Sequence, residues 1–307
     1  MAAAQGMLDE HHSPLPQESH DDNTYTFGRI GDHNVILACL PAGATGTISA
    51  AKVATQMLSS FKWLRFGLMV GIGGGVPSEE NDIRLGDVVI SQPTGAFGGV
   101  IQYDFGKTVR EGKFTRTGAL NKPPEVLLTA LASLQSKHIR QSHELSTYIS
   151  EMTKRYPRME TQIAYPGPQH DSLYDAQYDH PSGDTTCSQC DVSRLVVRES
   201  RPLEEPVIHY GLIASGDQVM RHGSTRDKLR REMNVLCFEM EAAGLMDSFP
   251  CVVIRGICDY ADSHKNKRWQ PYAAVTAAAY AKELLCAIPK GQVSGTYLAI
   301  ETTKVGK

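Results

Sequence analysis

The sequence predicts a single α/β domain with a twisted, mixed central β-sheet flanked by helices. Short apolar runs alternate with longer stretches of helical periodicity along most of the chain, which is typical of such sheets. Several of these runs end in glycine or acidic residues, and ligands in these folds bind at the carboxyl ends of strands. We therefore expect one domain over residues 25–290, preceded by a mobile lead-in over 1–24 and followed by a tail over 291–307.

The first half of the domain opens with a predicted hairpin. Its two strand-like runs, residues 26–30 and 34–40, are joined by Gly31-Asp32-His33, a turn-forming segment. The elements expected after the hairpin are a helix over 49–58, buried strands over 66–71 and 88–91, and helices over 124–134 and 144–155.

The second half begins with a tract over 156–206 that is rich in proline, aspartate and tyrosine. A tract of this length exceeds an ordinary loop and indicates an insertion on the domain surface. The elements expected after it are strands over 208–214, 235–239 and 251–257, helices over 225–233 and 242–247, and a closing helix over 270–288.

Composition limits the partners of the chain. Its 31 basic and 34 acidic residues give a formal net charge of −3, so a basic surface for nucleic acid is not expected. We find no apolar run that would span a membrane and no signal-peptide pattern at the first residues. Seven cysteines, most of them in apolar contexts, fit a reducing compartment. We therefore expect a cytoplasmic protein with a small-molecule partner.

Glycines follow the strand predicted over 66–71. Gly73 and Gly74 belong to the run Gly71-Ile72-Gly73-Gly74-Gly75, where the missing Cβ atoms allow backbone amides to approach a ligand closely. A tight turn without a ligand explains the same run equally well. The spacing differs from the dinucleotide-binding pattern.

Acidic residues follow two other predicted strands. Glu239-Met240-Glu241 places two carboxylates and a thioether at a strand end, and carboxylates accept hydrogen bonds from vicinal hydroxyls such as those of ribose. The alternative is an acidic helix start. Asp259 ends the next strand and could act as a general acid on a purine nitrogen, or form an ion pair with Arg255. Ser215 and Asp217 end a further strand.

Metal binding is a weaker hypothesis. His180, Cys187 and Cys190 are possible zinc ligands, but the Cys-x2-Cys pair has no second pair or histidine pair nearby. We therefore expect no metal and no cofactor.

Taken in order, several segments resemble the phosphorylase superfamily of nucleoside phosphorylases and nucleosidases. The chain is most similar to fungal domains that resemble 5′-methylthioadenosine/S-adenosylhomocysteine nucleosidases and often precede NACHT or ankyrin-repeat regions. The likeness runs from residue 25 to 288. The segments that carry it are Val70-Gly71-Ile72-Gly73-Gly74-Gly75, Leu85-Gly86-Asp87-Val88-Val89-Ile90-Ser91, Gly211-Leu212-Ile213-Ala214-Ser215-Gly216-Asp217-Gln218, Phe238-Glu239-Met240-Glu241-Ala242 and Arg255-Gly256-Ile257-Cys258-Asp259.

The resemblance implies roles for individual residues. Asp259 matches the acid that protonates the purine, Glu241 the carboxylate that binds the ribose diol, and Met240 the contact to the sugar face. Val219 stands where nucleosidases place an aromatic residue against the base. The remaining substrate-binding residues that we assign are Gly73, Gly74, Glu239, Ser215, Asp217, Met220 and Arg255. The resemblance also implies a homo-oligomer.

Two departures from the family bear on the reaction. Phosphorylases place a phosphate-binding arginine and a hydroxyl where this chain has Met69 and Ile72, which favours water over phosphate as the nucleophile. The family also opens with a strand that ends in a segment like Ala-Leu-Pro-x-Glu, whose glutamate can activate water. Ala2-Ala3-Ala4-Gln5 matches the helix after that strand, so the first family strand is missing from the sequence.

The missing glutamate leaves three explanations open. The chain could be truncated, another acid such as Glu79, Glu80 or Asp82 could substitute, or the domain could bind its ligand without turnover. The sequence therefore predicts a purine nucleoside or nucleotide N-glycosidic hydrolase. A nucleoside-binding module with little or no catalysis is the alternative, and a purine nucleoside phosphorylase is the third possibility.

Overall fold

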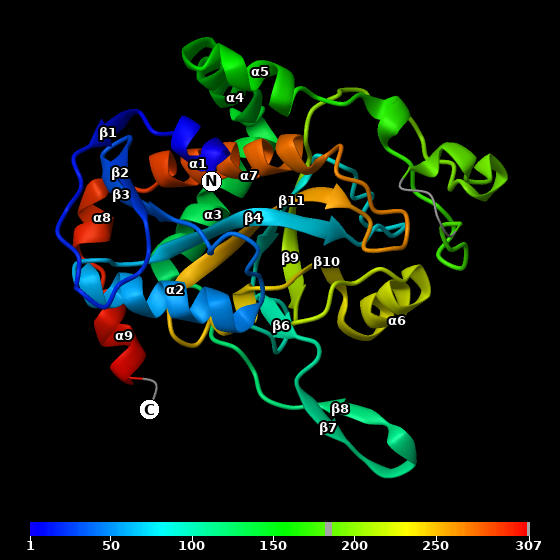
Figure 1. Cartoon of the computed structure of the whole chain (residues 1–307), viewed down its shortest axis with the longest axis horizontal. Helices are drawn as coiled ribbons and strands as arrows, with labels where there is room; N and C mark the ends of the chain where they lie inside the picture. Colours follow the sequence, from blue (N-terminus) through cyan, green and yellow to red (C-terminus); the bar gives the residue numbers. More distant parts are fainter. Residues whose placement is uncertain (182–185, 306–307) are drawn as a thin grey trace.

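A six-stranded mixed sheet forms the centre of the protein in a computed structural model that describes residues 1–181 and 186–305 (Figure 1). The order is β10-β4-β11-β5-β9-β6, and a further pairing between β10 and β9 closes five of these strands into a ring. This architecture confirms the predicted fold class. The strands are β4 (Gly67–Gly75), β5 (Val88–Ser91), β6 (Val100–Gln102), β9 (Ile208–Ser215), β10 (Val235–Glu239) and β11 (Cys251–Asp259).

Strand β11 is an inner strand of the sheet, and six of its nine residues are apolar. It runs parallel to β4 and antiparallel to β5, and all of its residues except Asp259 are buried. Strand β4 extends beyond the predicted run and includes the glycines up to Gly75. These glycines continue the strand because β11 and β10 supply hydrogen-bonding partners on both sides of Gly74.

Helices cover the sheet on two sides (Figure 1). Helix α7 (Gln270–Ala287) packs on β11, β4 and β5, and α2 (Thr47–Ser60) contacts the short 3-10 helix η5 (Ala242–Gly244). Only this 3-10 turn forms where a helix over 242–247 was predicted. The helices that pack against α7 are α1 (Ala2–Gly6), α3 (Glu125–Arg140), α4 (Leu145–Arg155) and α5 (Pro157–Ile163).

The amino-terminal residues are not a mobile lead-in throughout. Met7 and Leu8 are 2% and 0% exposed, and β1 (Glu10–His12) pairs with β2 (Tyr25–Ile30) of the predicted hairpin. The prediction of a mobile segment over 1–24 is therefore wrong for residues 7–12, whereas helix α1 forms where Ala2-Ala3-Ala4-Gln5 was matched to a helix of the family. Apolar Met7 and Leu8 enter the core beside α7, where the buried Lys282 donates a hydrogen bond to the carbonyl of Met7.

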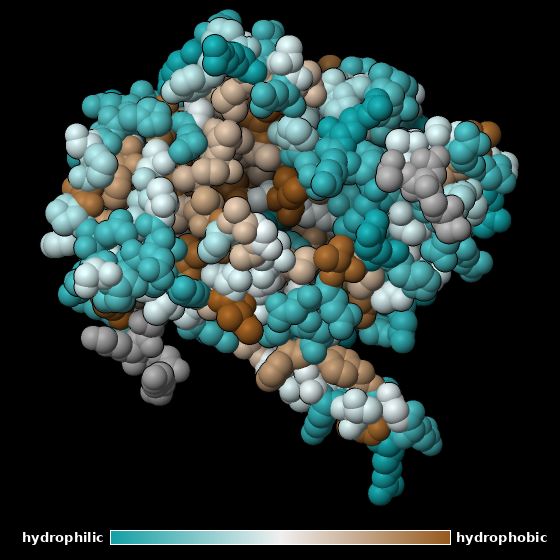
Figure 2. Space-filling model, viewed as in Figure 1, coloured by the Kyte–Doolittle hydropathy of each residue, from teal (hydrophilic) through white to brown (hydrophobic). Residues whose placement is uncertain are grey.

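Strand β4 has one open edge. Strand β10 pairs with it only at Gly74 and Gly75, so no strand among the described residues pairs with that edge from Gly67 to Gly73. Residues 67–72 are only half-buried, although β4 is an inner strand of the sheet order. Figure 2 shows a hollow lined by apolar side chains over this part of the molecule.

Two segments extend from the sheet. Strands β7 (Gly106–Thr108) and β8 (Phe114–Arg116) form a projecting hairpin (Figure 1) that contains the 3-10 turn η1 (Arg110–Gly112). The insertion predicted over 156–206 holds α5 and the 3-10 turns η2 (Pro168–His170), η3 (Cys187–Gln189) and η4 (Val192–Arg194). The other elements are β3 (His33–Ala38), α6 (Gly223–Met233), α8 (Lys290–Ser294) and α9 (Ala299–Val305).

The helices of the described residues include none that is long and apolar enough to cross a membrane. The longest, α7, carries the buried charged side chains of Lys282 and Glu283. Each has partners inside the protein: Lys282 pairs with Asp9, and Glu283 with Lys137 and His138. The charges on α7 therefore anchor the amino-terminal segment and α3 to the core.

Candidate functional site

The ends of three strands meet around β4. Gly74 lies opposite Phe238 of β10 on one side and opposite Asp259 of β11 on the other. Because neighbouring strands are about 4.8 Å apart, the backbones at Phe238 and Asp259 lie about 10 Å apart. Glu239, Met240 and Glu241 follow Phe238 directly. The two acidic segments singled out in the sequence therefore flank the same glycine-rich strand.

Arg255 links the two glutamates. Its Nη2 atom forms an ion pair with Glu239 and lies 3.3 Å from Oε2 of Glu241. Glu239 is fully buried, and its carboxylate also accepts hydrogen bonds from the backbone amides of Glu241 and Ala242. Two carboxylates against one guanidinium leave this part of the site with one negative charge. Glu241 is the more exposed of the two glutamates.

The glycines of β4 make room for the charged side chains of β11. Arg255 lies opposite Gly71 in the register, and a Cβ atom at Gly71 would overlap its guanidinium. A Cβ atom at Gly74 would lie 2.7 Å from Oδ1 of Asp259. The glycine run is therefore part of a strand whose missing side chains let Arg255 and Asp259 reach across it.

Asp259 has a lysine as its ion-pair partner. Nζ of Lys265 lies 3.0 Å from Oδ1 of Asp259, and the amide of Ala261 donates to the same oxygen at 2.9 Å. The thiol of Cys258 donates to Oδ2, and burial raises the pKa of that thiol well above its usual range. The predicted alternative, an ion pair between Arg255 and Asp259, does not form. Arg255 pairs with Glu239 and Glu241 instead.

The other residues predicted for the site do not all lie at the strand ends. Oγ of the buried Ser215 accepts a hydrogen bond from the amide of Ala243, which ties β9 to the segment after Glu241. Asp217 instead caps helix α2, since its carboxylate accepts from the amide and hydroxyl of Thr47 at 2.9 and 3.0 Å. Val219 is exposed, whereas Met220 packs against a cluster that contains Phe238.

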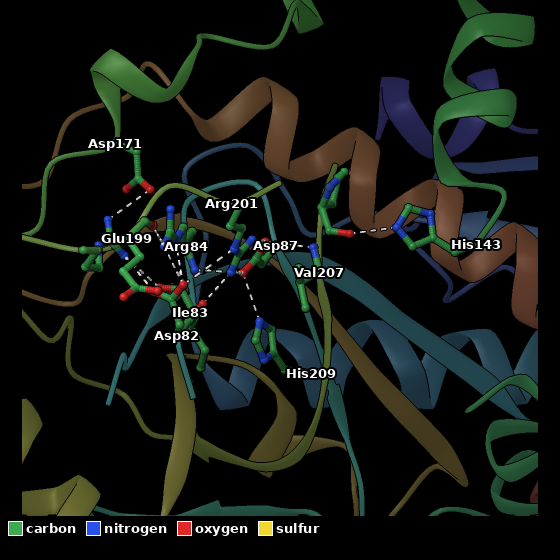
Figure 3. Close-up of polar contacts among 12 residues, drawn as sticks. Asp82, Ile83, Arg84, Asp87, His143, Asp171, Glu199, Arg201, Val207 and His209 are labelled. Atoms are coloured by element: carbon green, nitrogen blue, oxygen red, sulfur yellow. Dashed lines mark hydrogen bonds and ion pairs between the residues drawn. The ribbon is translucent and has the colours of Figure 1, made fainter. Parts of the chain in front are cut away.

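A buried polar centre at the start of β5, where Asp87 lies beside Ile257 of β11, was not predicted (Figure 3). Asp87 accepts hydrogen bonds from Arg201 at 2.6 and 2.8 Å, from the Val207 amide at 2.9 Å, and lies 2.9 Å from Nε2 of His209. Burial raises the pKa of Asp87, but the hydrogen bonds and charges of Arg201 and His209 outweigh it and hold this pKa below its ordinary value.

The Asp87 centre fastens the insertion to the sheet beside a cavity of about 510 Å³. Arg201 comes from the insertion and Asp87 from the start of β5. The cavity is lined by charged residues of both signs, including Arg84, Arg198 and Glu199. Its arginines are paired with acids, because Asp82 lies within ion-pair distance of Arg84, Arg198 and Arg201. The centre therefore has a structural role that its sequence signal, an aspartate before a buried strand, does not reveal.

The three possible zinc ligands of the sequence lie close together in the structure. The ligand atoms of His180, Cys187 and Cys190 all lie within 4.8 Å of one another in the insertion. These residues lie outside the strand ends around β4.

The mixed sheet has carboxylates at the carboxyl ends of β10 and β11, on either side of a glycine-rich strand. This arrangement is typical of α/β proteins that bind a small polar ligand at the strand ends. The chain belongs to the phosphorylase superfamily, because the model of that family matches residues 8–288. The match confirms the family resemblance and includes residues 8–24, which we had placed before the domain.

Relatives with similar sequences include nucleosidases. A nucleotide-binding leucine-rich repeat (NLR)-like protein of Hyaloscypha variabilis is 47% identical over 94% of this chain and 28% of that protein. The ATP nucleosidase Cap17 of Escherichia coli is 25% identical over 76% of this chain and 38% of its own length. A 5′-methylthioadenosine/S-adenosylhomocysteine nucleosidase of Mycobacterium bovis is 25% identical over 86% of this chain and 85% of its own. The chain thus spans well under half of the first two relatives.

Solved structures share the fold. The 5′-methylthioadenosine/S-adenosylhomocysteine nucleosidase of Neisseria meningitidis, in complex with methylthio-immucillin-A, superposes with a TM-score of 0.54 at 16% identity. The superposition covers 93% of this chain and 95% of that one. At this identity the likeness establishes the architecture alone.

Proposed function

We propose that the chain hydrolyses the N-glycosidic bond of a purine nucleoside or nucleotide. The observation that carries this proposal is the register around β4, which brings Asp259 and Glu241 to opposite sides of a strand with no side chain at Gly71, Gly73 or Gly74. A nucleoside spans about the same distance as the two strand spacings between these segments. The sugar would lie near Glu241 and the base near Asp259.

Asp259 would supply the proton that makes the base a better leaving group. Protonation of a ring nitrogen drains electrons from the glycosidic bond, so the sugar carbon gains oxocarbenium character as that bond breaks. Lys265 and the amide of Ala261 hold the carboxyl in place at 3.0 and 2.9 Å. A carboxyl that is already positioned does not have to be ordered when the substrate binds.

Glu241 would accept hydrogen bonds from the two ribose hydroxyls. Its carboxylate is oriented by Arg255 at 3.3 Å, and a carboxylate has lone pairs enough to accept from both hydroxyls at once. Met240 follows the same strand and offers an apolar contact for the sugar. These assignments follow the residue roles that the family resemblance implies.

Water suits this site better than phosphate as the nucleophile. Nη2 of Arg255 lies 3.5 Å from the Met69 sulfur, and this arginine is already bound to two glutamates. An incoming phosphate would meet the excess negative charge of that cluster instead of an available guanidinium. Hydrolysis is therefore our proposal over phosphorolysis.

The residue that would activate water is a separate question. Asp82 is a poor candidate: partial burial raises its pKa, but Arg84, Arg201 and Arg198 together hold the pKa below its usual value, and a weaker base removes a proton less well. Glu79 and Glu80 are exposed in the loop after β4. We propose that one of these two glutamates supports the reaction, and that turnover is slow if neither reaches the sugar.

The substrate is tested by offering the full chain adenosine, inosine, methylthioadenosine and ATP, each with and without inorganic phosphate, and measuring the free base. ATP belongs in this set because one relative is named an ATP nucleosidase. Base release that does not depend on phosphate is the expected result. Release of ribose 1-phosphate only in the presence of phosphate would instead identify a phosphorylase.

Asp259→Asn tests the proposed acid. The amide keeps the shape of the side chain but cannot donate the required proton, so kcat should fall by about 10²–10⁴-fold. The matched control is Asp22→Asn, which makes the same change in an exposed ion pair with Lys52 and should leave kcat unchanged. Equal activity of the two variants would contradict the proposal.

A binding module without turnover is the second candidate function. Calorimetry with the same four ligands separates it from the hydrolase, because the module would bind a nucleoside and release no base. Glu241→Gln should then weaken binding, since an amide presents one acceptor oxygen in place of two.

We also propose a cytoplasmic homo-oligomer. Supporting evidence for the oligomer comes from the β7–β8 hairpin, where Phe105 and Phe114 are both exposed, beside a cavity of about 210 Å³ that Phe105 lines. Exposed aromatic residues next to a hollow are typical of contact surfaces. Analytical ultracentrifugation of the wild type and of Phe105→Ser/Phe114→Ser tests this, with a shift to monomer as the expected result.

A further inference from the structure

The insertion carries a cluster of soft donor atoms that the proposed hydrolysis does not use. We infer that His180, Cys187 and Cys190, called the Cys-His cluster below, bind a zinc ion together with His264. The three cluster ligand atoms lie within 4.8 Å of one another. Zinc bonds of about 2.0–2.3 Å in a tetrahedron place ligand atoms about 3.4–3.8 Å apart. The distances between these ligand atoms would therefore shorten by about 1 Å when the ion binds.

The backbone of the insertion presents the two sulfur atoms on one turn. Cys187 begins the 3-10 turn η3, and the amide of Cys190 donates to the carbonyl of Cys187 at 3.2 Å. This Cys-x2-Cys turn is the spacing found in zinc sites. The two thiols are not joined in a disulfide, and Cys190 is buried.

The imidazole of His180 has surroundings that suit a metal ligand. Nδ1 lies 2.8 Å from the carbonyl oxygen of Pro181, and Nε2 lies 3.0 Å from that of Thr186. A neutral imidazole carries only one N–H, so one of its nitrogens faces a carbonyl with a lone pair. A metal ion would take that lone pair, and the other nitrogen would keep its hydrogen bond to a carbonyl, as is usual for zinc-binding histidines.

His264 is the independent observation that points to an ion. Its side chain is 3% exposed, and neither ring nitrogen has a hydrogen-bond partner in the structure. Oδ1 of Asp262 lies 3.8 Å from Nδ1 of His264, beyond hydrogen-bond distance. A buried imidazole without hydrogen bonds is costly unless another partner satisfies it.

His264 lies beside the cluster but outside the group of ligand atoms within 4.8 Å of one another, so its ring would shift toward the ion to become the fourth ligand. Its ring centroid lies 5.4 Å from that of His180, and its carbonyl oxygen lies 3.9 Å from the sulfur of Cys187. The ring is stacked at 4.2 Å on Tyr174, which keeps it beside the cluster. With two histidines and two cysteines, all four tetrahedral positions come from the protein, so the site is structural and has no open position for a substrate.

Binding balances charge inside the insertion. As the two zinc–sulfur bonds form, each thiol releases its proton to solvent, and two thiolates neutralise the divalent ion. The two histidines bind as neutral ligands. No net charge is therefore left in a partly buried region.

The zinc site would join the insertion to the loop after Asp259. His180 already donates its amide hydrogen to Oγ of Ser263 at 2.9 Å, and Lys265, the partner of Asp259, follows His264 directly. The ion would add a bond between these two segments. It would thereby hold the loop that positions Lys265 against Asp259.

Metal analysis of the purified full chain tests the site without any substrate. The expected result after incubation with zinc and removal of excess is about one zinc per chain. His180→Ala, Cys187→Ser and Cys190→Ser should each bring zinc to background, whereas Cys39→Ser, which changes an exposed thiol elsewhere, should keep it. A wild type without zinc, or a Cys190→Ser variant with as much zinc as Cys39→Ser, would overturn the proposal.

Cobalt replacement provides a test that does not depend on the folding of a variant. Cobalt(II) in the wild-type chain should show the visible spectrum of a tetrahedral ion and the charge-transfer bands of two thiolate ligands. An octahedral spectrum without sulfur bands would contradict the site. Both measurements are independent of base release, so a failed nucleosidase assay does not affect them.

A competition assay tests the fourth ligand. His264→Ala should weaken zinc binding at least tenfold against a chelator of known affinity, because water replaces an imidazole. His222→Ala, which removes an exposed histidine outside the insertion, is the control and should bind as the wild type does. Equal affinities of these two variants would overturn the role of His264.

Discussion

The strand-end site, formed by Glu239, Glu241, Arg255 and Asp259, and the Cys-His cluster hold their side chains by different means. Backbone register positions the strand-end site, since each residue lies in or directly after β10 or β11. The Cys-His cluster lies on short turns of an insertion whose described residues include no strand of the central sheet. We therefore expect the first site to exist without its ligand, and the second to need its ion for rigidity.

Removal of Arg255 would affect the strand-end site most strongly. Arg255→Met leaves the buried Glu239 without its counter-charge, which should lower the free energy of unfolding by about 3–5 kcal/mol. Urea unfolding measures this. Arg255→Met/Glu239→Gln should recover part of the loss, because no buried carboxylate is then left unpaired. Lys52→Met, in an exposed pair with Asp22, should cost less than about 1 kcal/mol.

A methyl group on β4 would have the next largest effect. Gly71→Ala directs a Cβ atom into the guanidinium of Arg255, and displacement of that side chain should cost about 1–3 kcal/mol of stability. Nucleoside affinity should fall as well, because Arg255 orients Glu241. Gly291→Ala is the control, since a Cβ atom there meets nothing within 4 Å. Equal unfolding curves for the two variants would mean that β4 tolerates side chains facing the site.

Zinc removal should separate the two regions. With a chelator present, hydrogen exchange of the full chain should be about tenfold faster in residues 168–181, 186–200 and 260–266. That ratio corresponds to about 1.4 kcal/mol of opening free energy. Exchange in β10 and β11 should not change, because sheet hydrogen bonds hold them. The Cys190→Ser variant should exchange quickly in both conditions. Faster exchange throughout the sheet would show that the two regions are not independent.

The smallest effect concerns the Asp87 centre, where the insertion meets the sheet. A carboxylate with a lowered pKa stabilises the fold above its unfolded value of 3.8, and this contribution is lost as the pH falls through the folded pKa. Below pH 3.8, the free energy of unfolding of the wild type should fall by up to about 1.4 kcal/mol per pH unit relative to that of Asp87→Asn. Urea unfolding between about pH 7 and pH 3 measures the difference. If the unfolding free energies of the two proteins fell equally with pH, groups other than Asp87 would cause the acid sensitivity.

Most of the fold could be predicted because its signals are local. The apolar runs that became β9, β10 and β11 lie within one or two residues of their predicted bounds. The three-residue strands β1, β6, β7 and β8 were missed, since such short segments show no clear alternation. The ordered residues 7–12 were missed because the partners of Met7 and Asp9 lie on α7, more than 250 residues away.

The two sites differ in what the sequence reveals. The order of the glycine and acidic segments led to the strand-end residues, and the roles assigned to Glu241 and Asp259 stay predictions. The ion partner of Asp259 was not predicted, because a lysine in a loop carries no signal of its own. For the Cys-His cluster, the Cys-x2-Cys spacing was visible. His264, which we propose as the fourth ligand, lies 74 residues beyond Cys190, too far away in sequence for any spacing rule.

The open edge of β4 has a practical consequence for handling the protein. From Gly67 to Gly73 this edge contains no lysine, proline or other residue of the kinds that protect sheet edges from one another. A bare apolar edge of this kind favours strand-to-strand association between molecules at high concentration. Solutions of the chain should therefore lose monodispersity as they are concentrated, which light scattering across a concentration series measures.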